Sequence, residues 1–259
     1  HGPQAFRRVF GLFKSDDTVR EKLQDCGDVA GLTQDVRINH RLAADLIRES
    51  HRASAASVIV GGGHDHGYSH LMGVSESYGK KGLKLCCINI DAHFDVRKPA
   101  PLISSGSPFY LALESGVLHP SRFVEFGIQS HCNGKELWDY ARAKKFHIVP
   151  MSALRHGRAV AEFKKALAKL STRCDVVVVN LDLDALAEAY APGVSAPQAE
   201  GFTPSEVNEM MELAGAARKV ASLGVFELNP MHDRGDCTAR VAATAVYHFL
   251  QGVDRRAKK

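Results

Sequence analysis

Ionisable residues stand at the ends of two strongly apolar segments of this sequence. Each group follows its apolar run directly, Asp91, His93 and Asp95 after residues 82–90 and Asp182 and Asp184 after residues 175–181. In a β-strand, residues two apart share one side of the sheet. We therefore expect each group to converge, provided that the extended conformation continues past Ile90. Buried carboxylates are costly when unpaired, and metal coordination is the usual remedy.

The number of these side chains favours two divalent cations over one. With His64, which follows a glycine triplet, the sequence offers four carboxylates and two imidazoles. A single tetrahedral zinc is held by only three or four side chains. Oxygen-rich ligation without thiolates favours hard or borderline ions, manganese above all. Four carboxylates balance the charge of two divalent cations, and a water held by both ions would be acidified towards hydroxide at neutral pH.

The rest of the sequence predicts the elements that position these residues. Strand-like runs occur at 53–61, 83–90, 122–128, 146–149, 175–183 and 221–228, and helical patterns at 38–52, 109–114, 135–145, 160–170, 204–218 and about 237–251. This alternation predicts a mostly parallel sheet with helices on both faces, as one three-layer α/β domain over residues 1–259. Ligand sites in such sheets lie beyond the carboxyl ends of the strands. His64, both acidic groups and Glu227 fall at those ends.

Together these motifs make the sequence recognisable. It resembles the ureohydrolase (arginase) superfamily, whose metal-site elements appear here as Gly61–His64, Asp91–Asp95 and Asp182–Asp184. Within that superfamily it is most similar to the formimidoylglutamase (formiminoglutamase) group, through Asp91–Arg97, Ser104–Phe109 and Ala191–Pro197. The resemblance implies an arginase-like fold. It also implies a binuclear centre of two manganese ions bound by His64, Asp91, His93, Asp95, Asp182 and Asp184.

The resemblance further implies individual roles for these ligands. His64 and Asp95 would complete the two coordination spheres, and His93 would bind the second ion. Asp91 and Asp182 would bridge the ions, with Asp184 as a further candidate bridge. Asp95 would also be catalytic, because the matching family residue orients the nucleophile and passes its proton to the leaving amine.

Other residues at the same edge bear on the substrate. Glu227 is an isolated acid in the apolar stretch Val225–Leu228, and a buried Glu is rare unless paired. The family uses the matching Glu to hold a cationic amidinium or guanidinium, which makes Glu227 a candidate catalytic and substrate-binding residue. Arg97 takes the place of a neutral amide in arginases and favours a more negative substrate through bidentate carboxylate pairing. N-formimino-L-glutamate, with two carboxylates and one amidine, fits both residues.

Three further residues are candidate substrate contacts. Ser105 stands about where arginases carry a histidine proton shuttle, which weakens an arginase interpretation. His131 and Asn133 follow the strand-like run 122–128 and therefore face the same edge.

Our first hypothesis is a hydrolase that cleaves the formimino group of N-formimino-L-glutamate to give L-glutamate and formamide, in histidine metabolism. An alternative is another ureohydrolase acting on a guanidino compound such as agmatine, arginine or a guanidino acid, which would release urea in place of formamide. A non-catalytic relative is a second alternative, and metal analysis would distinguish it. A single-zinc deacetylase on a related fold would leave His64 and Asp95 without a role.

Composition limits the cellular compartment and the classes of binding partner that we expect for the protein. Six cysteines have no spacing pattern, and Cys86 and Cys87 adjoin within an apparent buried strand, which favours reduced thiols in a cytoplasmic protein. Apolar runs fall short of the roughly 20 residues that cross a bilayer. The net charge of +4 is modest and shows no nucleic-acid pattern. We therefore expect a small-molecule amidine substrate and no nucleic acid or membrane partner, with a homo-oligomer left open. Residues 2–7 match a stretch that the family places after its first strand, so we expect one strand ahead of His1.

Overall fold

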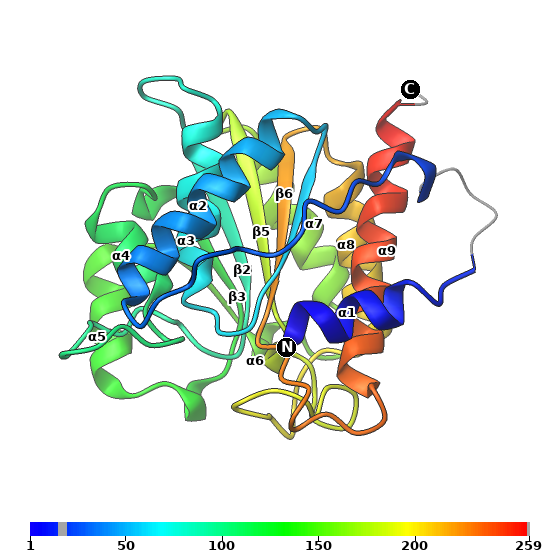
Figure 1. The fold of residues 1–259 in the computed structure, drawn as a ribbon. Helices are drawn as coiled ribbons and strands as arrows, with labels where there is room; N and C mark the ends of the chain where they lie inside the picture. Colours follow the sequence, from blue (N-terminus) through cyan, green and yellow to red (C-terminus); the bar gives the residue numbers. More distant parts are fainter. Residues whose placement is uncertain (15–19, 258–259) are drawn as a thin grey trace.

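Six parallel strands form the centre of the molecule in the computed structural model, which describes residues 1–14 and 20–257 (Figure 1). The strands are β1 (Ser57–Val60), β2 (Leu85–Ile90), β3 (Phe123–Ile128), β4 (His147–Pro150), β5 (Val176–Asp182) and β6 (Val220–Phe226). They lie in the order β1-β6-β5-β2-β3-β4, and all neighbours run parallel. All six predicted strands are present. The largest difference is at β1, which begins at Ser57 because Ala53 still caps the preceding helix.

Helices cover both faces of this sheet. They are α1 (Gly2–Phe10), α2 (Val36–Arg52), α3 (His66–Ser77), α4 (Pro108–Glu114), α5 (Lys135–Lys144), α6 (Met151–Leu154), α7 (Ala159–Ser171), α8 (Pro204–Ala216) and α9 (Cys237–Ala257). Short 3-10 turns lie at η1 (Arg20–Lys22), η2 (Pro120–Arg122), η3 (Ser130–Cys132) and η4 (Leu183–Ala185). Helices α2 to α5 lie on one side of the sheet, and α7, α8 and α9 lie on the other (Figure 1). That the whole of residues 1–259 forms one domain stays a prediction.

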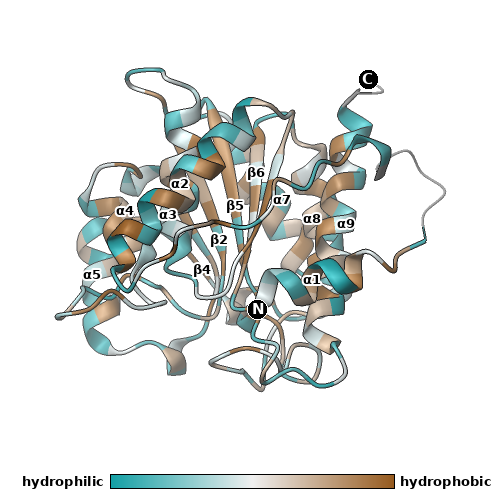
Figure 2. Cartoon of the chain, in the orientation of Figure 1, coloured by the Kyte–Doolittle hydropathy of each residue, from teal (hydrophilic) through white to brown (hydrophobic). Residues whose placement is uncertain are grey.

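The apolar residues fill two cores, one on each face of the sheet. Phe163, Met210 and Phe249 pack on the side of α7 to α9, and Leu71 and Phe109 pack on the side of α2 to α5. The strands are coloured as strongly apolar in Figure 2, whereas the outward helix faces are hydrophilic. Every residue of β2 and β5 is buried, as expected for parallel strands covered on both faces. Among the described helices, none combines the length and apolarity needed to cross a membrane.

Helix α3 was not predicted from the sequence. It contains Gly67 and Gly73, and glycine lowers helix propensity and interrupts an apolar pattern. The structure explains Gly73, because a Cβ atom there would lie 2.6 Å from the backbone oxygen of Ala44 in α2. The absence of a side chain therefore allows α2 and α3 to approach closely. Because α3 begins just after His64, this packing also bears on the candidate site.

Candidate metal centre and substrate pocket

The first part of the site is a buried contact between one imidazole and three carboxylates. His64 follows β1, and its Nδ1 lies 2.8 Å from Oδ2 of Asp182, 3.0 Å from Oδ2 of Asp95 and 3.2 Å from Oδ2 of Asp91. Asp91 directly follows β2, and Asp182 is the last residue of β5. The side chains are 0–11% exposed. Three strands of the sheet thus bring these four residues to one point.

A second group adjoins the first and shares Asp91 with it. Nδ1 of His93 lies 3.2 Å from Oδ2 of Asp184 and 3.5 Å from Oδ1 of Asp91. In each group the possible ligand atoms all lie within 4.8 Å of one another. The structure therefore brings together all six residues that the sequence suggested as metal ligands. Two groups joined by a shared carboxylate are the arrangement expected for two neighbouring ions.

The local conformation that achieves this convergence differs from the predicted one. Strand β2 ends at Ile90, and Asp95 has a left-handed backbone with φ of 48°, so the continued extended segment on which the predicted convergence was conditional does not form. In its place, Oδ1 of Asp91 accepts a hydrogen bond of 2.7 Å from the backbone N–H of His93. Oδ1 of Asp182 accepts one of 2.9 Å from the N–H of Asp184 in the same way. These two Asx turns place the second residue of each pair beside the first.

The electrostatics of the cluster fit divalent cations. Burial and the negative charge of Asp91 raise the pKa of Asp95 to about 7, and burial with the charge of Asp182 raises that of Asp184 well above its usual range. Burial lowers the pKa of His93, but hydrogen bonds to Asp184 and Asp91 outweigh it and raise that pKa to about 12. So many carboxylates resist ionising together without compensating positive charge. The oxygen-rich donor set with two imidazoles suits two hard or borderline cations.

Behind the cluster lies a polar pair that the sequence analysis did not single out. Nδ2 of Asn89 donates to Oδ2 of Asp91 at 3.1 Å and to Oε2 of Glu125 at 2.9 Å, and all three residues are fully buried. Burial and the charge of Asp91 raise the pKa of Glu125 well above its usual range. Asn89 and Glu125 face each other in the pairing of β2 with β3. The sequence did carry a signal for this pair, because Asn89 and Glu125 are each a polar residue inside an otherwise apolar strand.

A pocket opens over the candidate ligands. The residues that line it are His93, Asp95, Arg97, Ser105, Gly106, Cys132, Asn133, Leu137, Asp182, Asp184, Ser195, Ala196 and Glu227. Asp182 and Asp184 are buried, whereas Arg97 and Ser105 are exposed, so the ligands form the deep part and Arg97 belongs to the rim. Arg97 forms no ion pair with any residue in the described ranges.

Glu227 is held next to the candidate ligands by three contacts. Its Oε1 accepts a hydrogen bond of 2.9 Å from the backbone N–H of His64, and its Oε2 accepts one of 2.5 Å from Oγ of Ser195. Its own N–H donates to the carbonyl of Gly62 at 2.6 Å. Burial and the charge of Asp182 raise its pKa, and the two hydrogen bonds oppose that rise. Glu227 also adopts a left-handed φ of 63°, a strained conformation for this residue type.

The remaining predicted contacts lie in different settings. Oδ1 of Asn133 accepts from the N–H of Phe94 at 2.9 Å, and its Nδ2 donates to the carbonyls of Ala92 and Gln129 at 3.0 and 2.8 Å. Asn133 thus fixes the loop that carries the candidate ligands, although it also lines the pocket. His131 is exposed and is not among the described residues that line the pocket. Substrate contact by either residue stays a prediction. Ser195 was not predicted as a site residue.

Comparison with known proteins identifies the family. The sequence model described as the arginase family matches residues 1–251. The chain belongs to the arginase family. This membership confirms the predicted superfamily and agrees with a hydrolase of the formimidoylglutamase type.

Individual members of the arginase family are similar over most of the chain. Formimidoylglutamase from Staphylococcus carnosus is 32% identical over 249 residues, which cover 96% of this chain and 78% of that protein. The crystal structure of formimidoylglutamase from Bacillus subtilis matches with a TM-score of 0.89 at 22% identity, covering 98% of this chain and 81% of that one. A crystal structure of Trypanosoma cruzi formiminoglutamase with Mn2+2 matches with a TM-score of 0.87 at 28% identity, covering 98% and 86%. These matches confirm the predicted fold class.

Proposed function

We propose that this arginase-family protein hydrolyses N-formimino-L-glutamate to L-glutamate and formamide, a step of histidine degradation. The observation that carries the proposal is the pairing of charges in one pocket. The buried carboxylate Glu227 lies beside the candidate ligands, and the guanidinium of Arg97, which has no ion-pair partner among the described residues, lies at the exposed rim. A substrate with a cationic amidine at one end and carboxylates at the other complements both. The names of the similar proteins support the same substrate.

We propose two manganese ions per chain as the cofactor. His64, Asp91, His93, Asp95, Asp182 and Asp184 would hold them. Support comes from the buried carboxylates of the cluster, which resist ionising together without cations, and from the similar formiminoglutamase crystallised with Mn2+2. When bound, the ions lower the pKa of a water molecule so that it is nucleophilic near neutral pH.

Three residues of this chain bind the substrate and transfer the proton in the proposed reaction. Glu227 holds the amidinium and orients its carbon towards the deep part of the pocket, and Arg97 pairs with a substrate carboxylate. The water oxygen bonds to the amidine carbon, and the bond from that carbon to the glutamate nitrogen breaks. Asp95 takes the proton from the water and passes it to the departing nitrogen. The products are formamide and L-glutamate with a free amine.

The test is an assay of the manganese-loaded protein on N-formimino-L-glutamate, arginine and agmatine, with the released small molecule identified. Formamide as the main product supports the proposal. Preferential release of urea would instead favour a guanidino substrate, because Glu227 alone accommodates a guanidinium as well as an amidinium. No turnover in a protein that holds two ions would favour a non-catalytic relative.

We also propose a cytoplasmic location for the protein, with its single domain spanning residues 1–259. All six cysteines are free thiols in the structure, and three of them, Cys86, Cys87 and Cys174, are buried. Free thiols are usual in reducing compartments.

A further inference from the structure

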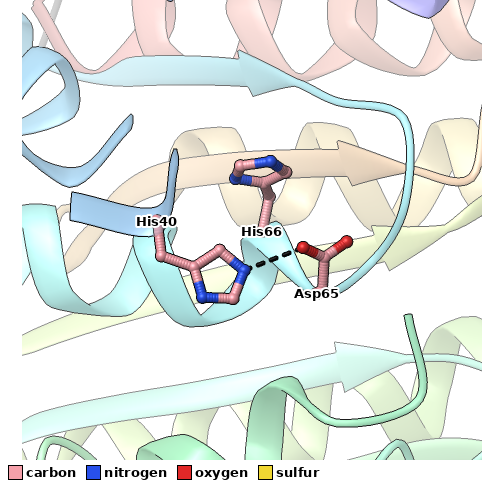
Figure 3. Close-up of side chains that lie close together, drawn as sticks. All are labelled: His40, Asp65 and His66. Carbon is pink, nitrogen blue, oxygen red and sulfur yellow. Dashed lines mark hydrogen bonds and ion pairs between the residues drawn. The ribbon is translucent and has the colours of Figure 1, made fainter. Parts of the chain in front are cut away.

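A third group of possible metal ligands lies outside the six residues described above. It consists of His40 from α2 and of Asp65 and His66 at the start of α3 (Figure 3). Nε2 of His40 lies 2.8 Å from Oδ2 of Asp65, and the rings of His40 and His66 meet edge to face with centroids 5.2 Å apart. One ligand atom from each residue lies within 4.8 Å of the other two.

The contacts of this group resemble those of the candidate ion ligands. His64 lies 2.8–3.2 Å from its three carboxylates, and His40 lies at the same close range from Asp65. No lysine or arginine in the described part of the chain pairs with Asp65, whose partner is the imidazole of His40. The negative charge of Asp65 can therefore be balanced only by a neighbouring imidazole, if protonated, or by a bound cation.

The surroundings of the two imidazoles favour ligation. His40 is 2% exposed, so its ring is held firmly within the packing of α2. Nδ1 of His66 lies 3.2 Å from Oγ of Ser69, which leaves the other ring nitrogen available. A hydrogen bond to one nitrogen that orients the ring for binding through the other is the usual arrangement around metal-bound histidines. Asp65 and His66 are only partly buried, which gives an ion a route of entry.

We propose that His40, Asp65 and His66 bind a third divalent cation, with zinc preferred over manganese. Two imidazoles and one carboxylate form a three-residue donor set typical of zinc, whose fourth ligand is water. The candidate ligands around Asp91 are richer in oxygen and suit manganese better. The proposal does not depend on the proposed substrate.

The position of this third site links it to the loop that carries His64. A Cβ atom at Gly63 would lie 2.7 Å from Oδ1 of Asp65 and 3.8 Å from Oε1 of Glu227, so these two carboxylates flank the same short stretch of backbone. A cation on Asp65 and His40 would tie α2 to the start of α3 immediately beside that loop. We expect zinc at this site to stabilise the protein further after manganese has been added.

The experiment counts metal ions on the full chain. Manganese-saturated protein is titrated with Zn²⁺ and, in a parallel series, with Co²⁺, whose visible absorption reports tetrahedral sites. Bound metal is then measured by elemental analysis after desalting. We expect two manganese ions plus one zinc or cobalt ion per chain. A total that stays at two, with zinc merely replacing manganese, would overturn the proposal.

Variants locate the third ion. His66→Ala should lower the total by one ion. Asp65→Asn should raise the Kd of the third ion at least about tenfold, because even mutation of residues that only hydrogen-bond to a metal ligand typically weakens metal affinity by that factor. His147→Ala, at an exposed histidine of β4, is the matched control and should keep the third ion. Asp182→Asn should lose manganese but retain one tightly bound zinc. Retention of the third ion by His66→Ala, or its loss from His147→Ala, would contradict the assignment.

Discussion

The backbone N–H of His64 donates a hydrogen bond of 2.9 Å to Oε1 of Glu227, although 163 residues separate them in the sequence. His64 is a proposed metal ligand and Glu227 the proposed partner of the amidinium. A displacement of either segment therefore moves the other, so this backbone contact fixes the spacing between the proposed metal ligand and the proposed partner of the amidinium. The other carboxylate oxygen of Glu227 is held by Ser195, so the carboxylate has little freedom to turn.

Glu227→Gln should weaken catalysis while leaving this architecture in place. The amide oxygen can still accept the hydrogen bond from His64, but the negative charge that holds the amidinium is lost. A hydrogen bond with a charged partner contributes about 1.5–3 kcal/mol. We expect kcat/KM to fall roughly ten- to hundredfold with metal content unchanged. The exposed Glu188 supplies a control, Glu188→Gln, which should behave as wild type. Full activity in Glu227→Gln would remove Glu227 from the mechanism.

Asp182→Asn should lose bound manganese and activity together. The asparagine oxygen can still accept the hydrogen bond from the N–H of Asp184, so the Asx turn survives while the charged ligand does not. Elemental analysis and circular dichroism of the purified variant measure the two effects separately. Asp175→Asn, just before the other end of β5, is the matched control because Asp175 is exposed and pairs with Lys80. Two tightly bound manganese ions in Asp182→Asn would disprove the ligand assignment.

Manganese should raise the melting temperature of the wild-type protein, and a chelator should lower it. An ion that binds only the native state adds about 2.7 kcal/mol at a concentration a hundred times its Kd. For a protein of this size that corresponds to about 5–10 °C per site. Differential scanning calorimetry with manganese and with chelator provides the comparison. The shift should shrink in Asp182→Asn, and equal melting curves for the wild type under both conditions would exclude a native-state ion site.

Metal binding should release protons, and the affinity should rise with pH. Burial lowers the pKa of His93, but its carboxylate partners raise it to about 12, so without metal this imidazole is protonated at pH 7. His64 likewise has a pKa well above its usual value because its hydrogen bonds to Asp182 and Asp91 outweigh its burial. Both must lose a proton to bind a cation. Calorimetric titration with manganese in buffers of different ionisation enthalpy should show at least two protons released per chain, because Asp184 and Asp95, whose pKa values are also raised, add to the two imidazoles. An affinity that is unchanged between pH 6 and pH 8 would contradict this.

Arg97→Ala should reduce activity on N-formimino-L-glutamate without reducing metal content. Loss of a charge-assisted pair with a substrate carboxylate is worth about 1.5–3 kcal/mol, or roughly ten- to hundredfold in kcat/KM. Most of the change should appear in KM if the pair forms equally in the ground and transition states. Arg97→Lys should recover only part of the loss, because lysine cannot form a planar two-point pair.

Lys98 gives the control for this test, since it is exposed and is absent from the described lining of the pocket. Lys98→Ala should therefore match wild type. Equal activity of Arg97→Ala and wild type on this substrate would leave Arg97 without a part in recognition and would favour a guanidino substrate.

The sequence predicted the strands and the convergence of the ligands because both depend on local patterns. Continuous apolar runs mark buried parallel strands, and the carboxyl ends of such strands must meet at one edge. Asp233 caps the last helix in a similarly local way, because its carboxylate accepts hydrogen bonds from the N–H groups of Thr238 and Ala239 at 2.9 and 3.0 Å. Each of these features is determined within a few residues of sequence.

The features that escaped prediction depend on contacts between distant segments. Helix α3 has a weak pattern, and its glycine Gly73 is explained only by the neighbouring Ala44 in α2. Asn89 and Glu125 become partners only once β2 and β3 pair in register. The hydrogen bond from Ser195 to Glu227 joins a loop to the end of a strand 32 residues away. No local pattern specifies such pairings.

The strand order has a consequence for how the chain is made. Strand β6, the last of the described strands along the chain, lies between β1, the first of them, and β5. Among the described strands β1 pairs only with β6, so on a ribosome this pairing cannot form until residues 220–226 have emerged. At about 5–20 residues per second, the 166 residues between Val60 and Phe226 take roughly 8–33 s to synthesise. Once β5 has emerged, its edge stays unpaired until β6 follows, and His64 and Glu227 do not meet before then. A chain released before β6 would be an aggregation-prone fragment, and the candidate pocket, which Glu227 lines, would assemble only after β6 has been made.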